Sequence, residues 1–65
     1  MEITNTEKII IDGDVGFPME HLKKSDISMT PYWVTVKHQD EIIFVPRERI
    51  KCITILKNKK TKIKD

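Results

Sequence analysis

Short runs of alternating apolar and polar residues, separated by polar or proline-containing segments, extend along most of this chain. The clearest run covers residues 32–38, where Val34 and Val36 alternate with more polar or aromatic neighbours. Successive side chains of a strand point to opposite faces, so this period of two predicts a β-strand. A second β-rich run, residues 42–45, follows after the polar residues 39–41. Two such runs joined by three polar residues predict a β-hairpin.

Three further segments, residues 8–12, 27–29 and 50–56, have the composition of short strands. Pro46 is expected to end the second strand of the hairpin, because proline has no amide hydrogen to donate to a sheet. The three residues Arg47-Glu48-Arg49 are too few for an α-helix and suit one 3₁₀ turn before the strand at 50–56.

Three segments near the N-terminus are less defined. Residues 1–7 are mostly polar and predict a frayed end or a short edge segment. Residues 12–16 hold both glycines of the chain and predict a turn or irregular loop. Residues 18–24 fit an edge strand, and they fit one or two helical turns with Pro18 at the first helical position equally well.

Four or five short strands with no long helix predict a mainly β fold. We expect a single small β domain over residues 1–56 with a loosely held N-terminus, followed by a basic C-terminal tail at 57–65. A set of short antiparallel strands closes economically as a small barrel, because closure removes exposed strand edges that invite aggregation.

The second half of the chain resembles the closing part of an SH3 domain. Tyr32-Trp33 opens a strand, Val45-Pro46 precedes the short turn at 47–49, and Ile50 and Ile53 take the aliphatic places that follow. The resemblance implies an SH3-like or Sm-like barrel.

Upstream, residues 22–27 are similar to the diverging turn of that family, with Ser25 where glycine is usual. The departures concern both the strands and the ligand groove. Tyr32 follows Ile27 by only five residues, which is too few for the strand and loop that the family places there. No Ala-Leu-Tyr-Asp-Tyr-like motif precedes the turn, and Arg49 stands in place of the groove tyrosine. The resemblance therefore implies a fold and not SH3 peptide binding, because fold analogy alone does not transfer function.

Composition supports strands and argues against a deep active site. The chain has no alanine and only two leucines, whereas isoleucine, valine and threonine supply 21 of its 65 residues. Branching at Cβ suits a pleated sheet better than a helix. A chain this short buries only about 60% of the surface that its unfolded form exposes. We therefore expect no catalytic site, and a single cysteine excludes an intrachain disulfide.

Metal ligands and cofactor motifs are sparse. His21, His38 and Cys52 are the only imidazole and thiol groups, and no two of them lie within ten residues of each other. Zinc commonly takes four ligands with two in a close pair, so we expect no metal, no cofactor, surface histidines and a small core cysteine. Asp12-Gly13-Asp14 begins like a calcium loop, but Lys23 stands where its last glutamate should be.

Charge is distributed unevenly along the chain, although the total is only +2. Residues 1–30 carry a net −3, residues 31–50 are neutral, and residues 51–65 carry a net +5. Such a basic end can neutralise phosphates, and aromatic rings can stack on bases. The alternative is a solubilising tail beside an aromatic core. For RNA or DNA binding the candidate residues are Tyr32, Trp33, Arg47, Arg49, Lys51, Lys57, Lys59, Lys60, Lys62 and Lys64.

A second function class is a protein-interaction or self-associating module. Short chains are often stabilised by oligomerisation, and residues 8–11 or 50–56 are candidate edges for pairing with a second copy. The Arg47–Arg49 turn is a candidate contact for an acidic partner. No apolar run approaches the length of a membrane span, and the first 20 residues lack the pattern of a signal peptide, so we expect no membrane partner and a cytoplasmic location.

Overall fold

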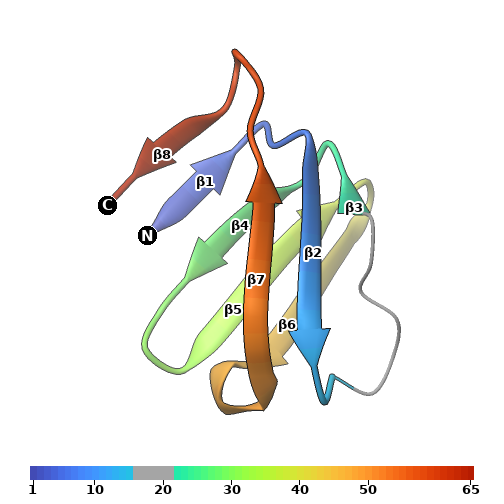
Figure 1. Ribbon diagram of the computed structural model, residues 1–65, viewed down its shortest axis with the longest axis vertical. Helices are drawn as coiled ribbons and strands as arrows, with labels where there is room; N and C mark the ends of the chain where they lie inside the picture. The colour runs from blue at the N-terminus through green and yellow to red at the C-terminus, as the bar shows by residue number, and fades with distance from the viewer. Residues whose placement is uncertain (16–21) are drawn as a thin grey trace.

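The computed structural model describes residues 1–15 and 22–65 (Figure 1). Strands make up most of this part of the chain, which confirms the mainly β class. Its elements are β1 (Glu2–Thr4), β2 (Lys8–Gly13), β3 (Leu22–Lys23), β4 (Asp26–Met29), β5 (Trp33–His38), β6 (Glu41–Pro46), the 3₁₀ turn η1 (Arg47–Arg49), β7 (Ile50–Leu56) and β8 (Lys62–Lys64).

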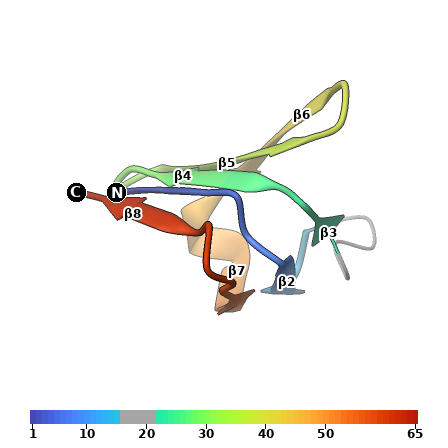
Figure 2. The same ribbon diagram turned by 90° about the horizontal axis from the view of Figure 1, so that it is seen from above.

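The strands form two antiparallel sheets that face each other as two layers (Figure 2). The larger sheet has the order β6-β5-β4-β1-β8, and the smaller has the order β3-β2-β7. Within the described residues no ladder of hydrogen bonds joins one sheet to the other, so the sheets do not close into a barrel. The outer strands of each sheet therefore have one edge without a ladder partner among the described residues.

The second half of the chain follows its predicted elements closely. β5 and β6 form the expected hairpin, with Val34 opposite Val45 and a two-residue turn in which Gln39 adopts a φ of 55°. Pro46 ends β6, η1 follows at once, and β7 has the predicted bounds. These elements were predictable because each depends on residues close together in the sequence.

At both ends of the chain the structure contains strands that the sequence-based prediction did not include. The N-terminal segment contains β1, which lies between β4 and β8 and places Ile3 opposite both Ile27 and Ile63. Residues 62–64 of the expected tail form β8, so the number of strands is eight in the described residues and not four or five. Ile3 is only 5% exposed, and the burial of its side chain is what fixes β1 in the sheet.

The end of β2 depends on a close approach that only glycine permits. Residues 12–16 were expected to form a turn, but β2 continues through Gly13, where its register against β7 shifts past Lys51. Gly13 has a φ of 151°, and a Cβ atom there would collide with the carbonyl oxygen of Arg49 and lie 2.9 Å from Ile50 Cα. The backbone amide of Asp14 then donates to that same carbonyl oxygen at 2.9 Å.

The turn after β3 separates the two sheets. Leu22 pairs with Ile9 in the smaller sheet, whereas β4 joins the larger one. Lys24 between them adopts a φ of 53°. The strand-or-helix alternative for residues 18–24 is answered only at Leu22–Lys23, which is a strand; residues 18–21 lie outside the described residues.

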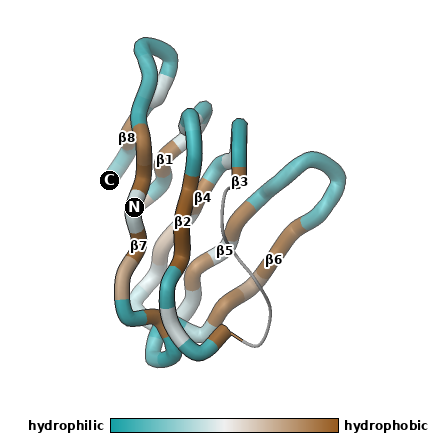
Figure 3. The backbone as a smooth tube through the Cα atoms, turned by 45° about the vertical axis from the view of Figure 1, so that its right-hand side comes forward, coloured by the Kyte–Doolittle hydropathy of each residue, from teal (hydrophilic) through white to brown (hydrophobic). Residues whose placement is uncertain are grey.

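The core lies between the two sheets, and the hydrophobic stretches of the strands contrast with hydrophilic turns (Figure 3). Of the three consecutive isoleucines, Ile9 and Ile11 point into the core and Ile10 points to the other face of its sheet. Among residues 1–15 and 22–65, all the buried core side chains are aliphatic, as the composition predicts. They are Ile3, Ile9, Ile11, Leu22, Ile27, Val34, Val36 and Val45.

Candidate nucleic-acid interface

The outer face of the larger sheet, which is the side opposite the core, carries three large exposed apolar side chains. Trp33 of β5 is 49% exposed, and Ile42 and Phe44 of β6 are 58% and 63% exposed. They are exposed because their neighbours Val34 and Val45 occupy the core side of the same strands. We call these three residues the apolar patch. Side chains of this size normally contribute to a core, so their grouping on one open face suggests a contact surface.

Lysines lie at the other end of the same outer face. In β8, Lys62 is opposite Thr4 and Lys64 is opposite Glu2. Residues directly opposite in a ladder share a face, so both lysines point away from the buried Ile3. Four strand spacings of about 4.8 Å separate β8 from β6, which places these lysines roughly 19 Å across the sheet from Ile42 and Phe44.

Lys37 brings a positive charge next to the apolar patch. It lies in β5, where its partners across the ladders are Asp26 on β4 and Ile42 on β6. The outer face therefore carries an aromatic and apolar end with one adjoining lysine, and a second basic end on β8.

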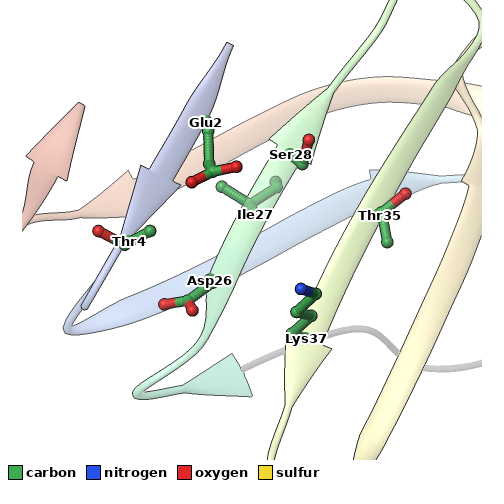
Figure 4. Close-up of a pocket in the computed structure, with 7 residues that line it drawn as sticks. All are labelled: Glu2, Thr4, Asp26, Ile27, Ser28, Thr35 and Lys37. Atoms are coloured by element: carbon green, nitrogen blue, oxygen red, sulfur yellow. The ribbon is translucent and has the colours of Figure 1, made fainter. Parts of the chain in front are cut away.

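A polar hollow lies between these two ends (Figure 4). Its volume is about 230 Å³. β1, β4 and β5 supply the side chains around it, and they include two carboxylates, three hydroxyl groups and one ammonium group. The lining residues are Glu2, Thr4, Asp26, Ile27, Ser28, Thr35 and Lys37.

Tyr32 lies beside the apolar patch, just before β5, and is 78% exposed. It lines a second hollow of about 240 Å³ together with Trp33, Pro46, Pro31 and Glu48. The phenol ring and the indole ring thus face solvent and are available to a ligand.

Arg47 lies in the chain between two residues that line this second hollow, Pro46 and Glu48, and is held by two hydrogen bonds. Its backbone amide donates to the carbonyl oxygen of Tyr32 at 3.0 Å, and its Nη1 donates to the carbonyl oxygen of Thr30 at 2.9 Å. The first bond fixes the backbone of Arg47 beside Tyr32, and the second holds its guanidinium group against the backbone of Thr30.

The structure does not bring all the predicted basic residues to this face. Lys51 is exposed on β7 in the smaller sheet, and Arg49 is exposed in η1. Neither residue is on a strand of the larger sheet. Residues 57–61 connect β7 to β8 and carry Lys57, Lys59 and Lys60, all exposed.

The connection that carries these three lysines is ordered by local hydrogen bonds. The amide of Asn58 donates to Thr61 Oγ1 at 2.9 Å, and the amide of Lys60 donates to Asn58 Oδ1 at 2.7 Å. Thr61 Oγ1 donates to the carbonyl oxygen of Asn5 at 2.8 Å, which ties the connection to the end of β1. The basic segment is therefore attached to the sheet at a defined place.

Sequence reasoning missed the polar hollow with its lysine, Lys37, and the two exposed apolar residues Ile42 and Phe44. The signal for the last two was present in the run at 42–45. Side chains alternate between the two faces of a strand, so when Val45 faces the core, Ile42 and Phe44 both point to the opposite face. The same alternation in β5, where Val34 and Val36 are buried, puts Lys37 on the outer face.

The burial of Cys52 and His38 differs from the expected core cysteine and surface histidines. Cys52 is exposed on the smaller sheet and is not a core residue. His38 is half-buried, and its Nδ1 lies 2.8 Å from the hydroxyl oxygen of Ser25, which is completely buried. Because the Ser25 hydroxyl is buried, a substrate cannot reach it, and its contact with His38 stabilises the packing of the protein. His21 lies outside the described residues.

No group of three or more His, Cys, Asp or Glu side chains in residues 1–15 and 22–65 is arranged to hold a metal ion. The same residues include no helix long and apolar enough to cross a membrane.

Comparisons of the chain with family models, curated proteins and solved structures give no match.

Proposed function

We propose that this protein is a non-catalytic, cytoplasmic β module that binds single-stranded nucleic acid across the outer face of its larger sheet. The observation that supports this most directly is that Trp33 and Phe44 share an open sheet face with Lys37, Lys62 and Lys64. Rings of this kind stack on bases, and lysines along the same path neutralise phosphates.

A single strand suits this surface better than a duplex. The faces of bases are accessible to aromatic side chains only when the bases are unstacked and splayed, as in single strands and loops. In addition, Glu2 and Asp26 lie between the two groups of lysines, so the surface has no continuous positive track for a duplex backbone. We therefore expect both RNA and DNA single strands to bind and duplex DNA to bind more weakly.

For the architecture, we propose an SH3-like or Sm-like arrangement. The turn that sends β3 and β4 to different sheets and the 3₁₀ turn after Pro46 support it. The binding proposal does not depend on this arrangement, because it uses only the outer face of one sheet.

Two measurements test the binding proposal. Fluorescence anisotropy of labelled oligonucleotides at low salt should show saturable binding, and the fluorescence of Trp33, the only tryptophan, should fall as bases stack on it. No anisotropy change up to tens of micromolar protein would contradict the proposal.

Paired lysine variants locate the binding surface. Lys62→Gln combined with Lys64→Gln should weaken binding severalfold, because two phosphate contacts are lost. The matched control is Lys8→Gln with Lys23→Gln, which removes the same charge from a cross-strand pair in the smaller sheet. Equal losses in both double variants would mean that only net charge matters and that the outer face is not the site.

Self-association through a strand edge is the second candidate function. Of the two edges expected from the sequence, residues 8–11 pair with β7 along their whole length and with β3 at Lys8 and Ile9, so this segment is less open to a second copy than β7. In residues 1–15 and 22–65, the seven-residue strand β7 has no ladder partner on its side away from β2, and its core-side Ile53 and Ile55 are only partly buried. Sedimentation at several concentrations tests this; a strict monomer at high concentration removes it.

A further inference from the structure

We infer that the polar hollow between Glu2, Asp26 and Lys37 receives one base of the bound strand and favours bases with an exocyclic amino group, cytosine over uracil. This inference rests on the proposed function and assigns a base preference to the same face. It explains why two carboxylates stand in the middle of a surface whose ends are basic and aromatic.

The hollow lies on the path that a bound strand must follow. One row across the sheet contains Lys64, Glu2, Ser28, Thr35 and Phe44, each opposite the next. With adjacent strands about 4.8 Å apart, the middle of this row is roughly 10 Å from each end. A strand that stacks on Phe44 and reaches Lys64 with a phosphate therefore passes directly over the hollow.

The size of the hollow suits a single base. Its volume of about 230 Å³ accommodates one pyrimidine or purine ring system together with some water, and the side chains around it come from three adjacent strands (Figure 4). Strands of a sheet are rigid supports, so the groups around the base are held at defined positions.

The carboxylates determine which base edge is accepted. An ionised carboxylate only accepts hydrogen bonds, so it pairs with an amino group such as N4 of cytosine and repels a carbonyl oxygen such as O4 of uracil. Asp26 Oδ1 already accepts the backbone amide of Asn5 at 2.9 Å, which holds the carboxylate in place and leaves Oδ2 for the ligand.

The residues that line the hollow also include hydrogen-bond donors for the other polar atoms of cytosine. Cytosine presents acceptors at N3 and O2 beside its amino group. The ammonium group of Lys37 and the hydroxyl groups of Ser28 and Thr35 are donors on the β4 and β5 side of the hollow. The hollow thus holds carboxylate acceptors on β1 and β4 and the ammonium donor on β5, so one base can find both acceptors and donors around it.

The test compares oligo(dC) with oligo(dU) of about twelve nucleotides, a length that covers one binding site. The two bases have the same ring size and differ at the 4-position. We expect the protein to bind oligo(dC) about five- to tenfold more tightly, measured by anisotropy and by Trp33 quenching.

Replacing the carboxylates should abolish this preference. In Glu2→Gln with Asp26→Asn the amide groups both accept and donate, so the ratio of the two affinities should fall to about one while binding itself persists. Glu2→Gln alone, at an exposed position, should lower the ratio without disturbing the contact between Asp26 and Asn5. Glu7→Gln with Asp40→Asn makes the same charge change at exposed sites outside the hollow and should leave the ratio unchanged.

The outcomes separate the two proposals. If neither oligonucleotide binds, the proposed function itself is wrong. If both bind with equal affinity, or if the carboxylate variants keep the preference, the interface stands and the base-reading role of the hollow is overturned.

Discussion

At the scale of single residues, two buried polar groups and one glycine set the geometry on which the strands depend. Thr6 and Ser25 are 1% and 0% exposed, and both are paired. Thr6 Oγ1 donates to the carbonyl oxygen of Ser25 at 2.6 Å, while the hydroxyl of Ser25 contacts His38 Nδ1 and the carbonyl oxygen of Lys23. Buried polar groups are costly when unpaired, so these contacts fix how the β1–β2 connection, the β3–β4 turn and the end of β5 meet.

Gly13→Ala tests the close approach at the end of β2. A Cβ atom at this position meets the backbone of Arg49 and Ile50, which cannot move without shifting β7. We expect the free energy of unfolding to fall by about 1–3 kcal/mol, measured by urea denaturation. Asp12→Ala, at the exposed neighbouring position, is the control and should change stability by less than about 0.5 kcal/mol. Equal stability of the two variants would contradict the steric argument.

At the scale of elements, β8 supplies both charge and stability. It pairs over three residues with β1, and without it β1 would be the edge of the larger sheet. A truncation that removes the basic end therefore removes a strand as well as lysines. Substitution of the lysines is the cleaner way to study binding, because it leaves the backbone ladder intact.

Deleting residues 62–65 should lower the free energy of unfolding by about 1–2 kcal/mol, because three cross-strand pairs are lost and the apolar side chain of Ile3 loses cover. Lys62→Gln with Lys64→Gln should leave the urea midpoint nearly unchanged. Comparing the midpoints of the two proteins checks this. An unchanged midpoint in the truncated chain would show that β8 contributes only charge.

At the scale of the whole molecule, the arrangement of charge matters more than its total. The net charge of +2 gives little general attraction for nucleic acid. The two sheets instead divide the basic residues, with Lys37, Lys62 and Lys64 on the outer face of the larger sheet and Lys8 and Lys23 on the smaller. Only the first group shares a surface with exposed aromatic rings.

This distribution predicts the salt dependence of binding. For single strands the logarithm of the binding constant falls with the logarithm of salt concentration by about 0.7 per phosphate neutralised. Three lysines on the outer face therefore predict a slope of about −2, and Lys62→Gln with Lys64→Gln should reduce its magnitude by about 1.4. Anisotropy titrations between low and physiological salt measure the slope. A slope near −4 would show that the three lysines at 57–60 also contact phosphate.

Local patterns predicted the hairpin, the end of β6 at Pro46, η1 and β7, because alternation, proline and short polar turns act over a few residues. The two ends of the chain were not predictable in this way. β1 and β8 have three residues each, and what makes them strands is pairing between segments about sixty residues apart in sequence. Nothing within either segment signals its partner.

The amino-acid sequence by itself determined that this protein is built from short strands, that its core is thin and aliphatic, and that its positive charge is concentrated at the C-terminal end. Only the tertiary structure decided which side chains share a surface. β8 pairs beside β1, and this ladder puts Lys62 and Lys64 on the face that carries Trp33 and Phe44, with Glu2 and Asp26 between them. Faces are set by register between strands, and register is a property of the packed sheet that no single stretch of sequence contains.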